Sequence, residues 1–433
     1  MTVLDRVVVT PIGADRPARA RAELCEVDGR TVAYVEIDGR RADQSGAAEA
    51  EVVERGLRLA GDLGCPVLIV IRSVSVTPDH GGIDALVAWG RVAAAAVRIS
   101  GVVPLLVAVT GAVHGSLTPL LGLADHVIVT RDATAYLNGP RPVSLVTGTA
   151  ITPTELGGAV VHATRSGLAA LVAHDHDDAV TALADLLAHF PDNHLVVPPH
   201  WPSTDSPHRQ CPAAAAVVPA ETNRSYDVRE VLADVFDEGS VLEVYASHAP
   251  NLVTAYARLD GRSVAVVANQ PAVRAGTLDI ESSGKGARHV QLADAFGLPI
   301  VTFVDTPGYQ PGRDLEWRGM IRHGAKLVHA YASASVPRVS VILRKAYGGA
   351  YIVMDSRTMG SDLVLAWPTA EIAVMGAPGA VAILHRRDLD TAHDPDARRL
   401  ELEAAYRDAY CSPRIAAERG LVDEVIDPAD TRR

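Results

Sequence analysis

A glycine turn that follows an apolar segment is the feature of this 433-residue chain with the clearest chemistry. The run Arg344-Lys345-Ala346-Tyr347-Gly348-Gly349-Ala350-Tyr351 comes directly after the apolar residues 339–343. A strand that feeds a Gly-Gly turn and opens a helix points several backbone N–H groups at one spot. Such donors can stabilise an enolate or thioester oxyanion, and glycine lets a carbonyl approach the backbone closely. Close packing of a helix on a strand would also require the glycines, so the motif alone leaves both interpretations open.

A related turn lies 233 positions earlier in the chain. Val113-His114-Gly115-Ser116 corresponds to Ala346-Tyr347-Gly348-Gly349, and both turns end an apolar run that follows a Val-Pro pair. Two such turns would provide two oxyanion holes, as a reaction with two successive enolates requires. The catalytic candidates are therefore the turn residues Gly115, Ser116, Gly348, Gly349 and Ala350.

A loop after another predicted strand is a second candidate for ligand binding. The apolar residues 300–304 lead into Asp305-Thr306-Pro307-Gly308, and α/β proteins bind ligands beyond the carboxyl ends of parallel strands. A plain turn with Asp305 as a cap explains the same residues equally well. The basic residues 322–326 are more typical of a solvated helix face than of an anion contact.

Composition excludes several classes of protein. The chain has 52 acidic and 40 basic residues and a formal charge of −12, which argues against a nucleic acid or an anionic membrane as partner. Its most apolar stretch, residues 86–109, contains two arginines and a proline, so it is not expected to span a membrane. The four cysteines are scattered without a CxxC pair and no secretory pattern is present, from which we expect a cytoplasmic location.

Other catalytic motifs are missing from the sequence. It has no phosphate-binding loop, no HExxH motif, no metal-ligand cluster among its 16 histidines and no Met-Lys biotinylation site. We therefore predict neither a metal centre nor a biotin attached to this chain.

The chain contains an internal repeat. DGRTVAYV at Asp28–Val35 recurs as DGRSVAVV at Asp260–Val267, and residues 59–71 recur at 292–304. Six such matches in the same order indicate two copies of one fold, each a hairpin followed by helices alternating with apolar strands, typical of a parallel sheet covered by helices. The predicted organisation is an N-terminal domain over residues 1–190, a Pro-rich linker over 191–225 and a C-terminal domain over 226–433.

The second copy carries a family resemblance. From Tyr226 to Pro428 the chain resembles the carboxyltransferase (β) subunit of biotin-dependent acyl-CoA carboxylases, of the propionyl-CoA/acetyl-CoA type. The matching runs include YDVREVLADVFDEG, GKGARHVQLADAFGLPIVTFVDTPGYQPG, RKAYGGAYIVM and AWPTAEIAVMGAPGAV. ISGVVPLLVAVTGAVHGS and ITPTELGGAVVHATRSGLA resemble the family's first domain, whereas the first hundred residues resemble it only weakly.

The resemblance implies an α/β protein with two tandem crotonase-like (ββα superhelix) domains, an acyl-thioester side and a biotin side, assembled into a homo- or hetero-hexamer. It implies transfer of CO₂ from carboxybiotin, held by a separate biotin carboxylase/biotin carboxyl carrier (α) subunit, to the α-carbon of a small acyl-CoA. Gly348, Gly349 and Ala350 would serve biotin, and Gly115 and Ser116 the thioester enolate. The substrate-binding candidates are Tyr347, Ile352, Asp305, Gly308, Tyr309 and His114.

The first copy departs from the family pattern. Its turn reads Val113-His114-Gly115-Ser116-Leu117 where the family has Cys-Ala-Gly-Gly-Ala, and residues 73–82 replace a Ser-Gly-Gly-Ala-Arg run. The biotin side thus matches the family and the acyl side is altered. Two alternatives stay open: a biotin-independent decarboxylase of a malonyl-type thioester, and a non-catalytic scaffold subunit of a carboxylase complex.

Overall fold

The computed structural model describes residues 6–7, 20–39, 46–75 and 82–433, and the chain divides into two compact units. The first comprises Met1–Pro199 with Tyr245–His248, and the second His200–Val244 with Ala249–Arg433. The expected linker, residues 191–225, is shared between them. Within it, Cys211 and Ala214 are buried in the core of the second unit, so this part of the segment packs against the fold.

The first unit is built on one mixed sheet in the order β1-β2-β3-β4-β5-β7-β9, with β6 pairing β4 and β8. Its strands are β1 (Arg6–Val7), β2 (Ala20–Val27), β3 (Arg30–Asp38), β4 (Val67–Ser75), β5 (Leu105–Val109), β6 (Ala112–His114), β7 (His126–Thr130), β8 (Thr134–Tyr136) and β9 (Leu171–Ala173). The pairs β1–β2 and β2–β3 are antiparallel and the other pairs are parallel. Asp28 and Gly29 make the hairpin turn with φ values of 50° and 77°, which explains the predicted DGR turn.

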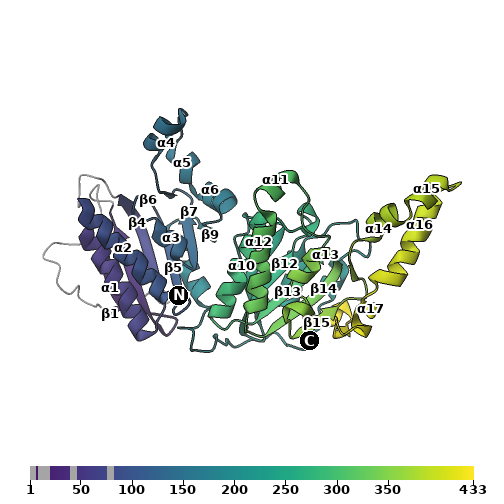
Figure 1. Cartoon of the computed structure of the whole chain (residues 1–433). Helices are drawn as coiled ribbons and strands as arrows, with labels where there is room; N and C mark the ends of the chain where they lie inside the picture. The colour runs from purple at the N-terminus through teal and green to yellow at the C-terminus, as the bar shows by residue number, and fades with distance from the viewer. Residues whose placement is uncertain (1–5, 8–19, 40–45, 76–81) are drawn as a thin grey trace. The chain divides into compact units, whose positions relative to one another are not determined.

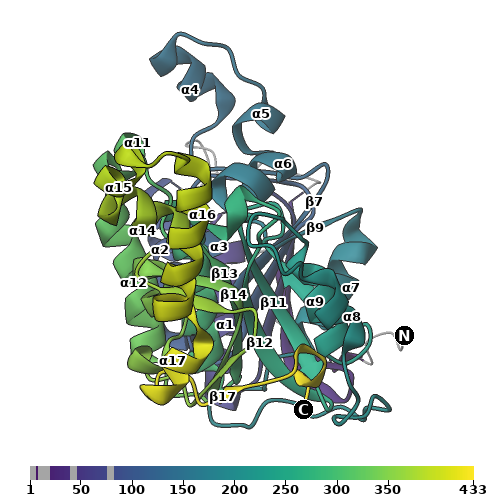
Figure 2. The same ribbon diagram turned by 90° about the vertical axis from the view of Figure 1, so that its right-hand side faces the viewer.

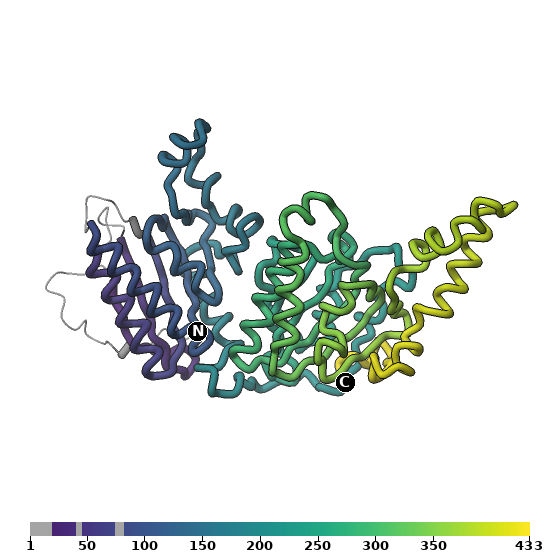
Figure 3. The backbone as a smooth tube through the Cα atoms, in the orientation of Figure 1, coloured from purple at the N-terminus to yellow at the C-terminus, as the bar shows by residue number. Residues whose placement is uncertain are grey.

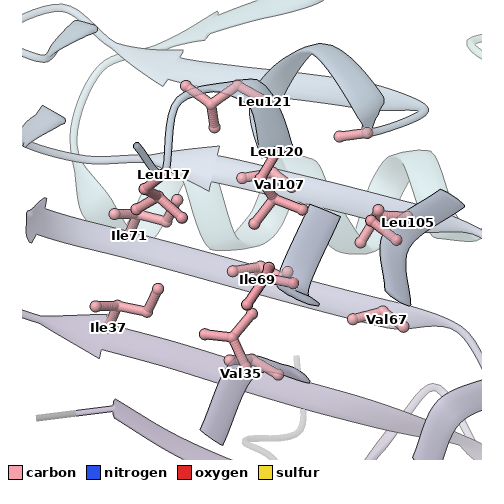
Figure 4. Packing of buried hydrophobic residues seen from close by; sticks show 14 of the residues in the cluster. Val35, Ile37, Val67, Ile69, Ile71, Leu105, Val107, Leu117, Leu120 and Leu121 are labelled. Carbon is pink, nitrogen blue, oxygen red and sulfur yellow. The ribbon is translucent and has the colours of Figure 1, made fainter. Parts of the chain in front are cut away.

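Helices cover this sheet on both faces, as the apolar strands require. The helices of the first unit are α1 (Ala47–Leu63), α2 (Gly82–Ile99), α3 (Pro119–Leu123), α4 (Pro140–Thr147), α5 (Pro153–Gly157), α6 (Ala159–Val161) and α7 (His176–Leu187), with a π-helical turn at His162–Ser166. Figure 1 shows α1 and α2 side by side against the sheet. Val67, Ile69 and Ile71 of β4 alternate into the core beneath them, where Figure 4 shows them against Val35 and Val107 of the neighbouring strands.

The second unit repeats this topology, with the sheet order β10-β11-β12-β13-β14-β15-β17 and β16 pairing β14. Its strands are β10 (Leu242–Val244), β11 (Leu252–Leu259), β12 (Arg262–Asn269), β13 (Ile300–Thr306), β14 (Arg338–Tyr347), β15 (Leu363–Ala366), β16 (Glu371–Ala373) and β17 (Glu424–Val425). The hairpin β11–β12 turns at Asp260-Gly261, again with positive φ at both residues. The single strand β14 pairs both β15 and β16, and so takes the place of both β5 and β6 of the first unit. It ends at Tyr347, four residues beyond the end at Leu343 that the apolar run 339–343 predicted.

The helices of the second unit are α8 (Pro212–Val217), α9 (Val228–Val235), α10 (Ile280–Ala295), α11 (Arg313–Trp317), α12 (Met320–Ser333), α13 (Gly348–Val353), α14 (Ala377–Leu384), α15 (Arg386–Thr391), α16 (Pro395–Tyr406) and α17 (Pro413–Glu418). Shorter helical turns lie at Arg274–Gly276, Arg357–Met359, Arg407–Cys411 and Pro428–Asp430. Figure 2 shows β11 to β14 of this sheet from the side. The equal strand order in the two sheets confirms the predicted α/β fold of two duplicated copies.

Each unit also has helices that extend away from its sheet. In Figure 3 the segment of α4 and α5 leaves the first sheet, and the segment of α15 and α16 leaves the second. Neither α4 nor α15 contains a buried residue. Among the described residues, no helix has both the length and the apolar character that a membrane crossing needs.

A substitution of Gly111, which lies between β5 and β6, tests how closely the first sheet is packed. A Cβ at this position would lie 1.7 Å from the carbonyl oxygen of Arg72, whereas a Cβ at Gly122 of α3 would meet nothing within 4 Å. We expect Gly111→Ala to lower the free energy of unfolding by about 1–3 kcal/mol, as overpacking does, and Gly122→Ala to leave it unchanged or slightly higher. Urea unfolding of both variants measures this, and equal midpoints would contradict the tight contact.

Candidate active site

The glycine turn of the second unit lies where β14 ends at Tyr347 and α13 begins at Gly348. Gly348 has a φ of 58°, in the left-handed region that favours glycine, and a Cβ there would lie 3.2 Å from the carbonyl oxygen of Val374. Gly349 is exposed, whereas Ala350 is buried. The first N–H groups of a helix have no acceptor within it, so the turn presents donors beyond the carboxyl end of the strand.

Tyr309 lies beside this turn. A Cβ at Gly349 would be 3.5 Å from its ring atom Cε2, and one at Gly324 of α12 would be 3.1 Å from its Oη. Backbone bonds fix the loop, since the Leu278 N–H donates to the Gly308 oxygen at 3.1 Å and the Gln310 N–H donates to the Leu278 oxygen at 2.8 Å. Burial raises the pKa of Tyr309 to about 12, so the phenol is protonated near neutral pH. The structure thus brings Tyr309 to the turn, and Gly308 precedes it in the same loop.

Asp305, another substrate-binding candidate, lies in a different setting. Its carboxylate is fully buried, 3.0 Å from Nε of an equally buried Arg344 and 3.7 Å from Nζ of Lys345. The backbone N–H of Lys345 donates to the same carboxylate at 3.2 Å. Asp305 therefore joins the end of β13 to Lys345 of β14, three residues before Gly348. A residue in this position can orient the glycine turn.

Arg344 also holds a segment that sequence reasoning assigned to the linker. Its Nη1 donates to the carbonyl oxygens of Pro219, Glu221 and Arg224 at 3.3, 2.8 and 2.8 Å. Its guanidinium carbon lies 5.1 Å from the ring centroid of Tyr226. Arg344 was missed as a functional candidate, although two basic residues that end a buried strand directly before a glycine turn were a signal for it.

Tyr347 is buried, and its hydroxyl donates to the carboxylate of Glu371 on β16. Burial and this carboxylate both raise the pKa of the phenol. Arg407 approaches the other carboxylate oxygen at 3.6 Å, so a polar chain runs from the turn to the π-helical turn at Arg407–Cys411. Ile352 lies on α13 with 43% of its surface exposed, available for contact with a ligand.

The turn of the first unit also has a glycine at positive φ, but the residues around it differ from those of the second unit. β6 ends at His114, and Gly115 follows with a φ of 89°. Thr118 donates to the Gly115 oxygen from its N–H at 3.1 Å and from its Oγ1 at 2.8 Å, which closes a β-turn before α3 begins at Pro119. Helix therefore does not begin at the glycine here, as it does in the second unit.

Two side chains of this first turn are distinctive. The ring of His114 stacks on Tyr136 of β8 with centroids 5.6 Å apart, and burial lowers its pKa, which keeps the imidazole neutral near pH 7. The Oγ of Ser116 is buried and has no hydrogen-bond partner among the described residues. Of the altered run at 73–82, residues 76–81 lie outside the part of the chain that is described.

Each unit thus has a glycine at positive φ directly after a strand of its parallel sheet, Gly115 after β6 and Gly348 after β14. Such an arrangement can hold a carbonyl oxygen on which negative charge develops. In the described part of the chain, no group of three or more His, Cys, Asp or Glu side chains is placed to hold a metal ion.

The pair of Asp305 and Arg344 can be tested against a surface pair of the same unit. Arg344→Met leaves a buried carboxylate without its partner, and we expect a loss of about 3–5 kcal/mol in the free energy of unfolding. Arg398→Met removes a partner from the exposed pair that Arg398 forms with Glu401 at 2.7 Å, and should cost less than about 1 kcal/mol. Denaturant unfolding measures both, and a small loss for Arg344→Met would show that the pair does not hold the turn.

Comparison with known proteins shows the family of the chain. The model of the carboxyl transferase domain matches residues 22–433. The carboxyltransferase subunit of propionyl-CoA carboxylase from Haloferax mediterranei is 44% identical over 409 residues, which are 94% of this chain and 79% of that protein. The alpha subunit of methylmalonyl-CoA decarboxylase from Veillonella parvula is 38% identical over 408 residues, 94% of this chain and 78% of that protein.

A solved structure shows the same fold. The crystal structure of the transcarboxylase 12S hexamer, with methylmalonyl-coenzyme A and methylmalonic acid bound, matches with a TM-score of 0.91 and 40% identity. The match covers 96% of this chain and 79% of that one. The chain therefore belongs to the carboxyl transferase family, which confirms the resemblance to the carboxyltransferase subunits of acyl-CoA carboxylases and the crotonase-like α/β fold that the resemblance implies.

Proposed function

We propose that this carboxyltransferase moves CO₂ from carboxybiotin to the α-carbon of a small acyl-CoA, with one backbone oxyanion hole in each unit. The observation that carries the proposal is the pair of left-handed glycines, Gly115 and Gly348, at equivalent positions of the two copies. The names of similar proteins support propionyl-CoA or methylmalonyl-CoA as the substrate class.

The turn at Gly348 suits the ureido oxygen of biotin because the backbone there is open. Gly349 has no side chain, and a Cβ would already be in contact with the ring of Tyr309. Carboxybiotin supplies the carboxyl group and, once decarboxylated, a base for the acyl α-proton. Gly348, Gly349 and Ala350 would orient it through their N–H groups, while Tyr309 and Ile352 border the same turn.

The turn at Gly115 would hold the thioester oxygen. The N–H groups of Gly115 and Ser116 would stabilise the negative charge that this oxygen gains when the α-proton leaves, the kind of contact that is often the largest catalytic contribution. His114 is neutral and Tyr309 is protonated near neutral pH, and neither is needed as the base. The side chains therefore position and shield the substrates, and the backbone supplies the donors.

Gly349→Val tests the turn of the second unit. The added side chain fills the space over the N–H donors, so we expect kcat to fall by about 100-fold, the effect of losing one oxyanion donor, with little change in stability. Gly284→Val in α10 is the matched control, because a Cβ there meets nothing within 4 Å. The measurement is transfer of labelled carboxyl between methylmalonyl-CoA and biotin. Unchanged activity of a complex that contains Gly349→Val would instead support the scaffold alternative.

The same assay distinguishes carboxyl transfer from the alternative, biotin-independent decarboxylation. The similarity to a methylmalonyl-CoA decarboxylase subunit is the reason to test it. The purified chain would be supplied with methylmalonyl-CoA and malonyl-CoA, with and without a biotin-carrying protein. Transfer that requires biotin supports the proposal. Release of CO₂ at the same rate without biotin would overturn it.

We also propose that the chain works as a hexamer and receives biotin from a separate biotin carboxylase/biotin carboxyl carrier subunit. The hexameric transcarboxylase neighbour supports the assembly. Leu145 and Val146 of α4 are 76% and 88% exposed on a helix with no buried residue, and such apolar surface is typical of an interface. The cytoplasmic location stays a proposal, and all four cysteines are free and buried.

Leu145→Asp tests the role of α4 in assembly. Burying a leucine contributes about 2 kcal/mol, so a charge at this position should shift the hexamer toward smaller species. Thr149→Asp is the control, since it adds the same charge at an exposed polar residue of the same segment. Sedimentation velocity measures the distribution, and an unchanged hexamer of Leu145→Asp would place the interface elsewhere.

A further inference from the structure

The two glycine turns differ at one position in a way that the repeat makes visible. Ser116 stands 233 positions before Gly349, so the first turn carries a hydroxymethyl group where the second has only hydrogen. In the second unit, a Cβ at Gly349 would lie 3.5 Å from the ring atom Cε2 of Tyr309. The two copies therefore use the same location differently.

The Ser116 hydroxyl is left without a partner in an otherwise well-bonded turn. Its Oγ is buried and makes no hydrogen bond with any described residue. The neighbouring Thr118, by contrast, uses both its N–H and its hydroxyl on the Gly115 oxygen. Buried polar atoms in folded proteins usually have a partner, and a hydroxyl without one beside a candidate oxyanion hole is free to bond a ligand atom.

The rest of the turn holds Ser116 in place. Leu117, the next residue, is buried in the core of the first unit, and the β-turn closed by Thr118 fixes the backbone on both sides. A serine hydroxyl rotates freely about its C–O bond and can donate one hydrogen bond to an acceptor that arrives later. The group is positioned before the substrate binds, which is the condition for effective electrostatic stabilisation.

We propose that the Ser116 hydroxyl is an additional donor to the thioester oxygen of the acyl-CoA, alongside the N–H groups of the first turn. This inference rests on the proposed function of that turn. As the α-proton leaves, the carbonyl oxygen gains negative charge and the Ser116 O–H donates to it more strongly. No bond to Oγ forms or breaks, and the proton stays on the serine. The second turn has no such side-chain donor, so the two holes differ in strength.

Three variants separate the hydroxyl from the shape of the side chain. Ser116→Ala removes the donor and keeps Cβ, Ser116→Gly introduces the residue that the second turn has at the equivalent position, and Ser116→Thr keeps the hydroxyl. We expect kcat for carboxyl transfer to fall by about 100-fold in Ser116→Ala and Ser116→Gly, with KM for the acyl-CoA little changed. Ser116→Thr should retain most of the activity. Thermal unfolding should show that all three variants fold.

A binding measurement gives a readout that does not depend on turnover. The probe is a CoA thioether with a nitronate in place of the acyl enolate, compared with propionyl-CoA itself by titration calorimetry. Ser116→Ala should weaken binding of the nitronate by about as much as kcat falls and leave binding of propionyl-CoA nearly unchanged.

The outcomes distinguish the two proposals. If the wild-type protein transfers carboxyl groups and Ser116→Ala matches it in kcat and in nitronate affinity, the hydroxyl donor is wrong while the proposed function stands. If the wild-type protein neither transfers carboxyl groups nor prefers the nitronate to propionyl-CoA, the proposed function is wrong and the hydroxyl donor with it. Equal losses in Ser116→Thr and Ser116→Ala would assign the effect to shape and would also overturn the donor.

Discussion

The buried pair of Asp305 and Arg344 is the interaction on which the second unit's turn depends. Both side chains are fully removed from solvent, where an isolated charge would be very costly. The pair is tolerable because Arg344 also donates to three carbonyl oxygens of residues 219–224, and the Lys345 N–H donates to Asp305. These bonds join β13, β14 and the segment before α9 into one rigid frame. Gly348 follows Arg344 by four residues, so this frame fixes where the glycine turn lies.

The first unit reaches a similar turn without that pair. The repeat places Arg72 at the position of Asp305 and Gly111 at the position of Arg344. Arg72 pairs with Glu36 and lies 2.8 Å from Nε2 of His176, while Gly111 lets the backbone pass close to the Arg72 carbonyl oxygen. The charges are thus rearranged and the left-handed glycine is retained. The two copies therefore share a glycine at positive φ and differ in the side chains around it.

Much of this could be predicted from sequence, because repeats and turn motifs can be recognised from residue types and spacing alone. The repeated DGR hairpin and Val-Pro strands indicated two copies of one fold, and Gly115 and Gly348 indicated a turn at the same point of each copy. The end of β14 was placed four residues too early, because Arg344 and Lys345 are not residues expected inside a buried strand. Their partners lie 39 and more positions away, at Asp305 and in a Pro-rich segment that looked like a linker. Burial of a charge depends on such distant partners, so periodicity could not reveal it.

The same reasoning explains why an altered first turn is compatible with family chemistry. When backbone N–H groups supply the stabilisation, a change of side chain leaves the donors in place as long as the glycine at positive φ remains, and Gly115 does remain. Under the proposed function, the changes at His114 and Ser116 would act on the surroundings of the bound oxygen, through a ring stacked on Tyr136 and a buried hydroxyl. Substrate preference and the strength of the hole can then change without loss of the reaction.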